Sequence, residues 1–116
     1  MRHEASYLMD ILSACGKIQA ITADTSEESF LGDHVLPAAV LHHLTVIGEA
    51  INRLSPELRA RHPKIQWRQI VAVRHRIVHA YFDLDLKILW NAALDEIPQL
   101  RKQIAQILES EFPERN

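Results

Sequence analysis

The sequence contains one cysteine and three glycines in 116 residues. The lone Cys15 excludes an internal disulfide framework and any site built from paired cysteines, such as a CxxC zinc or redox site. Neither a GxxxxGK loop nor a GxGxxG fingerprint occurs, which excludes the two common phosphate-binding loops. No apolar run approaches the roughly 18 residues that span a bilayer, and the first residues lack the apolar core of a secretory signal. We therefore expect a cytoplasmic protein that does not enter the membrane.

The composition is that of one soluble globular domain, which we expect to cover residues 1–116. Hydrophobic residues make up 47% and charged residues 24% of the sequence, proportions that exclude a disordered or collagen-like chain. A chain of this length buries roughly two-thirds of its unfolded surface around a single core.

The net charge of −2 is unevenly distributed along the chain. The segment from Arg53 to Phe82 holds seven basic residues and one acidic residue, Glu57, so it sums to +6 and the remainder to −8. Such a cationic segment can attract a phosphate-bearing partner, or it can be a solvated basic face without a partner. Its basic residues are Arg53, Arg59, Arg61, Lys64, Arg68, Arg74 and Arg76.

Apolar residues recur at helical spacing along almost the whole chain, and no segment shows the alternation of a strand. The spacing predicts an all-α bundle of about four long antiparallel helices plus a short helical turn. The long helices are expected at 4–23, from Asp33 to about residue 54, at 66–79, and from Asp83 or Asp85 through Ile107. A loop is expected at 24–32, and the short turn begins at Ser55 and stops before Pro63.

Two prolines have clear positions in this scheme. Pro37 fits the first turn of a helix capped by Asp33, where the missing N–H is not needed. Pro98 falls in the middle of the last helix and should kink it, because it removes one backbone hydrogen bond and crowds the preceding turn.

The densest cluster of reactive side chains is Arg74-His75-Arg76-Ile77-Val78-His79-Ala80-Tyr81. One interpretation is structural, with the cations at the polar edge and the C-terminal end of a helix. A second is a metal site, because His75, His79 and Asp83 are four residues apart, although Arg74 and Arg76 would repel a divalent cation. Among the other histidines, His3 and His62 are expected to be solvated.

The third interpretation is acid–base chemistry on a phosphodiester. Arginine offers a planar fork of donors that matches phosphate, and histidine titrates near neutrality. Together they could cleave RNA without a metal or any other cofactor, through attack of the ribose 2′-OH on the neighbouring phosphorus. DNA lacks that hydroxyl and would resist cleavage.

Helix geometry constrains this interpretation. Five positions on a helix leave Arg74 and His79 roughly 140° apart around the axis. Either the helix loosens near His79, or the arginine reaches around it, or a second copy of the chain completes the site. Tyr81, seven positions after Arg74, would return to the face of the arginine.

The spacing Arg74-x4-His79-x-Tyr81 resembles the RX4HXY motif of HEPN domains, and the surrounding residues resemble the HepT-like branch. The segments 46–55, 67–71 and 83–86 are similar to the second-helix block of that family, to its lead-in to the motif and to its exit into the last helix. The resemblance covers nearly the whole chain and is most specific from about Val46 to Trp90.

The resemblance implies a dimeric, helical ribonuclease toxin of a type VII-like toxin–antitoxin pair, encoded beside a minimal nucleotidyltransferase (MNT) antitoxin. By similarity, Arg74 would hold and polarise the scissile phosphate and His79 would act as acid or base. His75 and Arg76 would support RNA or phosphate binding, although many relatives have Asn at the position of His75. Tyr81 matches the tyrosine that the antitoxin AMPylates.

Two alternatives stay open at this point. The chain could be a catalytically silent HEPN subunit that binds nucleotide or a nucleotidyltransferase partner, in which case the basic segment serves docking. It could also be a helical dimerisation module with no chemistry of its own.

Overall fold

The computed structural model describes the backbone of residues 3–78 and 86–114, and the side chains of residues 3–73 and 86–114. Every regular element in these ranges is helical, which confirms the all-α prediction. The elements are α1 (Glu4–Ala23), α2 (Glu27–Leu31), α3 (Leu36–Arg53), α4 (Pro56–Arg61), α5 (Trp67–Val78), α6 (Leu86–Asn91), the π-helical segment η1 (Ala92–Glu96) and α7 (Ile97–Glu111).

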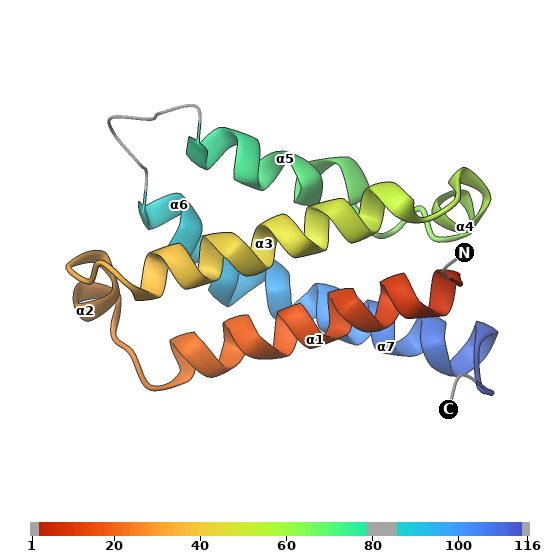
Figure 1. Cartoon of the computed structure of the whole chain (residues 1–116), viewed down its shortest axis with the longest axis horizontal. Helices are drawn as coiled ribbons and strands as arrows, with labels where there is room; N and C mark the ends of the chain where they lie inside the picture. Colours follow the sequence, from red (N-terminus) through yellow and green to blue (C-terminus); the bar gives the residue numbers. More distant parts are fainter. Residues whose placement is uncertain (1–2, 79–85, 115–116) are drawn as a thin grey trace.

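The long helices form a bundle in which α3 lies between α1 and α5 (Figure 1). Helix α1 contacts α3 and α7, whereas α5 contacts α3 and α6. The short helices α2 and α4 lie at opposite ends of α3, and both chain termini lie at the α4 end (Figure 1). Helix α5 therefore packs on the side of α3 that faces away from α1.

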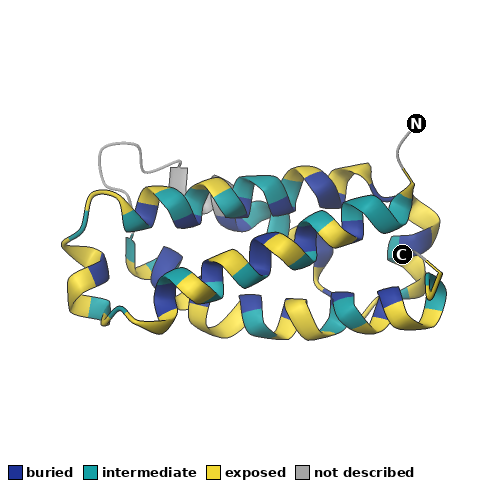
Figure 2. Ribbon diagram, turned by 60° about the horizontal axis from the view of Figure 1, so that its bottom comes forward, coloured by how far each residue is buried: buried dark blue, intermediate teal, exposed yellow. Residues whose placement is uncertain are grey.

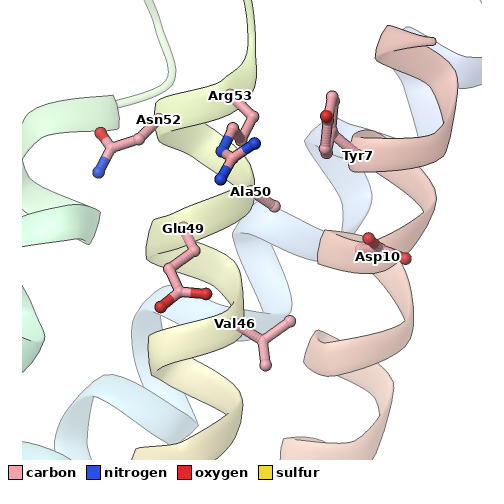
Figure 3. Close-up of a pocket in the computed structure, with 7 residues that line it drawn as sticks. All are labelled: Tyr7, Asp10, Val46, Glu49, Ala50, Asn52 and Arg53. Carbon is pink, nitrogen blue, oxygen red and sulfur yellow. The ribbon is translucent and has the colours of Figure 1, made fainter. Parts of the chain in front are cut away.

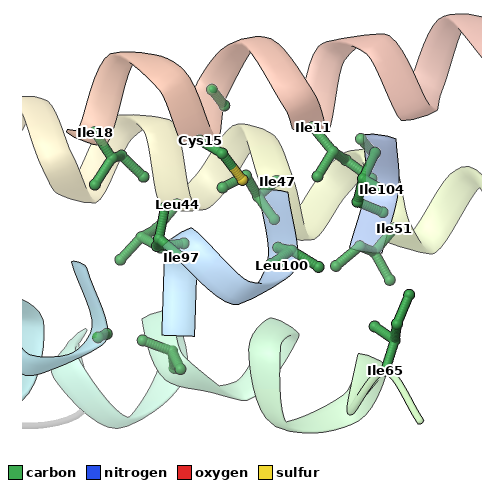
Figure 4. Packing of buried hydrophobic residues seen from close by; sticks show 14 of the residues in the cluster. Ile11, Cys15, Ile18, Leu44, Ile47, Ile51, Ile65, Ile97, Leu100 and Ile104 are labelled. Atoms are coloured by element: carbon green, nitrogen blue, oxygen red, sulfur yellow. The ribbon is translucent and has the colours of Figure 1, made fainter. Parts of the chain in front are cut away.

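One apolar core joins these helices. Figure 2 shows buried residues alternating with exposed ones along each long helix, as expected for amphipathic helices around a common core. Cys15 is part of this core, and burial raises the pKa of its thiol to about 12, so the thiol stays protonated at neutral pH. The central side chains in Figure 4 include Ile11, Ile18, Leu44, Ile47, Ile51, Ile97, Leu100 and Ile104.

Helix α1 has the predicted bounds, 4–23. Its buried stripe is Leu8, Ile11, Ala14, Cys15, Ile18 and Thr22, whereas Tyr7, Leu12 and Ile21 are only partly buried. Thr22 can lie in the core because its hydroxyl donates to the carbonyl oxygen of Ile18 at 3.1 Å.

The expectation of a loop over 24–32 is wrong, because residues 27–31 form helix α2. The hydroxyl of Ser26 caps this helix by accepting a hydrogen bond from the Ser29 N–H at 3.1 Å. Phe30 is fully buried, and the centres of its ring and of the Trp90 ring are 5.0 Å apart. Burial of Phe30 against Trp90 thus stabilises a helix in a segment whose sequence shows little helical periodicity.

Asp33 binds the start of the next helix as predicted, although α3 begins at Leu36 and Val35 takes the N-cap position. The Asp33 carboxylate accepts hydrogen bonds from the N–H groups of Val35 and Leu36 at 2.7 and 3.0 Å, and Pro37 lies in the first turn of α3. Ser55 likewise caps α4, since its hydroxyl accepts from the Leu58 N–H at 3.1 Å. These caps satisfy N–H groups that have no acceptor within their own helix.

The predicted fourth helix is a continuous helical run over 86–111 that contains the π-helical segment η1. In η1 the N–H of Ile97 donates to the carbonyl oxygen of Ala92, five residues earlier. Pro98 follows directly and has no N–H to donate to the carbonyl of Leu94. A π-helical turn thus directly precedes Pro98, the position at which a kink was predicted. Prolines and π turns are both recognised causes of helix kinks.

None of the helices within 3–78 and 86–114 combines the length and the apolar character that crossing a membrane requires.

Replacing Phe30 by Ala tests the role of α2. We expect Phe30→Ala to lower the free energy of unfolding by about 3–5 kcal/mol, because it leaves a cavity against Trp90. Leu31→Ala is the matched control, since Leu31 is 37% exposed in the same helix and should cost less than about 1 kcal/mol. Urea unfolding followed by circular dichroism measures both. Equal losses of unfolding free energy in the two variants would show that α2 does not depend on Phe30.

Candidate active site

Helix α5 carries the first part of the predicted motif. Its start is held by Trp67, which is 8% exposed and whose indole N–H lies 3.1 Å from the carbonyl oxygen of Arg59 and 3.2 Å from that of His62. Val73, further along α5, is 1% exposed and belongs to the core. The indole therefore ties α5 to the end of α4, and Val73 fixes its inner face.

The structure describes the backbone of only some of the motif residues. Arg74, His75 and Arg76 lie in α5, and nothing is described of their side chains. His79 and Tyr81 lie outside the described residues, as does Asp83 of the alternative metal site. The roughly 140° separation of Arg74 and His79 and the return of Tyr81 to the same face thus stay predictions.

The cations of the basic segment have different environments. Arg61 donates to the Glu111 carboxylate at 2.7 Å, and His62 also contacts that carboxylate. The expectation that His62 is solvated is therefore wrong, because the chain brings α7 next to the end of α4. One guanidinium of the +6 segment is neutralised by a residue 50 positions away in sequence.

A pocket between α1 and α3 has a volume of about 520 Å³ and mixed charge. Figure 3 shows Arg53 and Glu49 on α3 beside Tyr7 and Asp10 on α1. Because two carboxylates share its lining with one guanidinium, this pocket is poorly suited to an anionic ligand. Its lining residues are Tyr7, Asp10, Val46, Glu49, Ala50, Asn52 and Arg53.

A second pocket, which we call the α5 pocket, lies between α3, α4 and α5 and has a volume of about 360 Å³. Its two charged residues are Arg59 and Arg68, and no carboxylate is among its lining residues. Asn52 borders both pockets and extends from α3 on the side away from α1 (Figure 3). The complete lining of the α5 pocket is Ile51, Asn52, Arg59, Trp67, Arg68, Val71 and Ala72.

Comparison with known proteins identifies the family. A family model described as "Ribonuclease HepT-like" matches residues 11–107, a range that contains all of α3, α4 and α5 and residues 74–81. The chain belongs to the HepT-like ribonuclease family. The resemblance to the HepT-like family is thereby confirmed over residues 11–107.

Curated relatives support the same assignment to the HepT-like family. A protein of Caldanaerobacter subterraneus subsp. tengcongensis named "Putative RNase" is 37% identical over 111 residues, which cover 96% of this chain and 99% of the relative. The "Probable ribonuclease HepT" of Thermococcus cleftensis is 33% identical over 91% of this chain and 96% of its own. A "Putative RNase" of Methanocaldococcus jannaschii is 32% identical over 89% of each chain. No solved structure gives a significant match.

The sequence alone did not predict the α5 pocket. Arg59 and Arg68 were counted in the basic segment without being placed together. The available signal was the charge count, since both arginines belong to the +6 segment. Their common pocket depends on how α4 turns back toward α5, which helical periodicity does not encode.

The Glu111 contacts predict how stability depends on pH. Folding lowers the pKa of the Glu111 carboxyl, mainly through the hydrogen bond from Arg61 and also through the contact with His62. A carboxyl of this kind stabilises the fold above its unfolded pKa, and the stabilisation is lost as pH falls through its folded pKa. We expect Glu111→Gln to unfold at lower urea concentration than the wild type at neutral pH.

The difference from the wild type should shrink as the pH falls below the ordinary carboxyl value of 4.5. Glu109→Gln, an exposed carboxylate on the same helix, is the control and should follow the wild type at every pH. If Glu111→Gln remained less stable than the wild type by the same amount in acid, the proposed role of the Glu111 contacts would be contradicted.

Proposed function

We propose that this chain is an endoribonuclease that cleaves RNA without a metal ion. The observation that carries the proposal is the HepT-like match over residues 11–107 together with Arg74 and His79 at the spacing of the RX4HXY motif. The names of two relatives, "Putative RNase" and "Probable ribonuclease HepT", support RNA as the substrate. The α5 pocket supports it further, because its two arginines lie on and beside the helix that carries the motif.

The proposed reaction is an internal transesterification. The ribose 2′ oxygen forms a bond to the adjacent phosphorus as the bond from phosphorus to the 5′ oxygen breaks, which leaves a 2′,3′-cyclic phosphate and a free 5′-hydroxyl. His79 takes the proton from the 2′-OH or delivers one to the departing 5′ oxygen. The Arg74 guanidinium binds the phosphate and stabilises the charge that develops on its oxygens. His75 and Arg76 assist in holding the phosphate.

The proposal includes a second copy of the chain. A dimer that brings two α5 helices together would supply a cleft and would complete each site, given the roughly 140° between Arg74 and His79 on one straight helix. The small size of the bundle supports this arrangement, because 116 residues leave little material for a cleft within one copy.

The proposed cellular role is that of a toxin controlled by a nucleotidyltransferase antitoxin. The partner would transfer AMP from ATP to Tyr81, so that the phenolic oxygen bonds to the α-phosphorus and pyrophosphate leaves. The added phosphodiester would place bulk and negative charge beside Arg74 and His79 and so exclude the RNA phosphate.

Cleavage of labelled RNA by the purified chain tests the ribonuclease proposal. In a chelator such as EDTA, we expect products that end in cyclic phosphate, and no cleavage of DNA of the same sequence. His79→Ala should lower kcat by about 10²–10⁴-fold and Arg74→Ala by about 10²–10³-fold, the usual losses for an acid–base group and for a charge-stabilising donor.

Arg101→Ala is the control for the loss of one arginine and should cleave as the wild type does, because Arg101 lies on α7 and hydrogen-bonds Gln19 of α1. Once the cleavage site is mapped, a substrate with hydrogen in place of the attacking 2′-OH should be inert. Cleavage of that substrate, or cleavage that requires added divalent metal, would refute the mechanism. A wild-type protein that binds nucleotide and cleaves no RNA would favour a silent subunit.

Intact mass tests the modification of Tyr81. Co-expression with a minimal nucleotidyltransferase from a neighbouring gene should add one AMP-sized increment and abolish RNA cleavage. Tyr81→Phe should gain no increment under the same conditions. The sequence has only one other tyrosine, Tyr7, so Tyr7→Phe is the matched control and should be modified like the wild type. The same increment on Tyr81→Phe would place the modification elsewhere.

A further inference from the structure

We propose that the α5 pocket binds one nucleotide of the RNA strand that flanks the scissile phosphate, with Arg59 and Arg68 on its phosphate. The proposal rests on the proposed ribonuclease function and names a binding subsite outside the RX4HXY motif. It follows from the charge, the size, the chemistry and the position of this pocket.

The surroundings of Arg59 and Arg68 differ in charge from those of the other two described arginines of the basic segment. Arg61 is bound by Glu111, and Arg53 shares its pocket with Asp10 and Glu49. By contrast, Arg59 and Arg68 line one pocket that has no carboxylate in its lining. Two guanidiniums without a counter-charge repel each other, and an anion between them relieves that repulsion.

Arg59 has hydrogen-bonding capacity that the protein does not use. Its Nε is buried and has no hydrogen-bond partner among the residues that the structure describes. Its main chain, however, is held in place, because the carbonyl oxygen accepts from the Trp67 indole at 3.1 Å. The bond from Trp67 holds the main chain of Arg59 and leaves its guanidinium free to turn, so the unused donor can be offered to an anionic ligand.

The rest of the lining fits a nucleoside. Val71 and Ala72 are partly exposed and offer apolar contact, whereas Ile51 and Trp67 belong to the core. Asn52 brings an amide that both donates and accepts, which is what recognition of a base edge requires. A volume of about 360 Å³ lies at the small end of the ~300–1,000 Å³ range of ligand pockets, so the site suits one nucleotide and not several.

The pocket also lies next to the motif. Arg68 and His75 are seven positions apart on α5, which places their backbones about 10 Å apart along the axis and within about 20° around it. Trp67 and Arg74 have the same separation. A single strand that follows α5 can therefore reach both the pocket and the motif.

Binding of a 2′-O-methyl RNA oligonucleotide tests the inference, because this RNA keeps its phosphates and lacks the attacking hydroxyl. Fluorescence anisotropy with the full chain at several salt concentrations gives Kd and its salt dependence. We expect Arg68→Gln to raise Kd about tenfold and to reduce the slope of log Kd against log salt by about 0.7, the value for one lost phosphate contact on a single strand. Arg68→Lys should recover part of the affinity.

Arg59→Met should lose a similar amount of RNA affinity, since it keeps the apolar stem of the side chain and removes the guanidinium. Arg68 is exposed, so its variant does not depend on whether Arg59→Met folds. Arg101→Gln, which removes the same charge from α7, should keep the wild-type Kd and slope. In cleavage assays, Arg68→Gln should raise KM and leave kcat nearly unchanged, unlike Arg74→Ala.

The outcomes separate this inference from the proposed function. RNA cleavage by the wild type together with wild-type Kd and slope in Arg68→Gln and Arg59→Met would overturn the subsite and leave the ribonuclease standing. Arginine-dependent binding without cleavage would support the subsite and refute the ribonuclease. If the wild type neither binds nor cleaves RNA, both are wrong. Tight binding of free AMP that equals binding of the oligonucleotide would show a mononucleotide site instead of a strand site.

Discussion

The indole of Trp67 determines where helix α5 begins. Its N–H is shared between the carbonyl oxygens of Arg59 and His62, at the end of α4, while its ring is almost completely buried. A buried indole needs an acceptor, and exposed carbonyls at a helix end need a donor, so each satisfies the other. This contact sets the start of the helix on which Arg74 lies and one wall of the α5 pocket. The candidate site therefore depends on a junction about two helical turns before Arg74.

Periodicity predicted the long helices because each has a wide apolar face that packs on a neighbour. It placed α1 at its observed bounds and began α5 one residue early, at Gln66. It failed for α2, which has five residues and would not be stable by itself. That helix depends on a contact between Phe30 and Trp90, sixty residues apart in sequence, and no local pattern reports such a contact. The π turn before Pro98 is a similar case, since sequence predicts a defect there but not its form.

The motif could be found from sequence because its residues are close along the chain. Arg74, His79 and Tyr81 form a recognisable spacing without any knowledge of the fold. The electrostatic surroundings could not be found in this way. Whether a cation is available to a ligand depends on which carboxylates the fold brings near it, and Glu111 reaches Arg61 only through the packing of the last helix beside α4. Charge counts along the chain thus overestimate the free positive charge.

The described arginines of the cationic segment lie in three different environments. Arg61 stabilises the junction of α4 with α7, Arg53 lies among carboxylates, and Arg59 and Arg68 share a pocket without them. A phosphate gains most where guanidiniums are already close together and not yet paired, because no existing salt bridge has to be broken. Arg59 and Arg68 thus bring two positive charges together where α4 meets the helix that leads to the motif. In a chain whose net charge is −2, such a local pair of cations can attract an anionic partner that the protein as a whole does not attract.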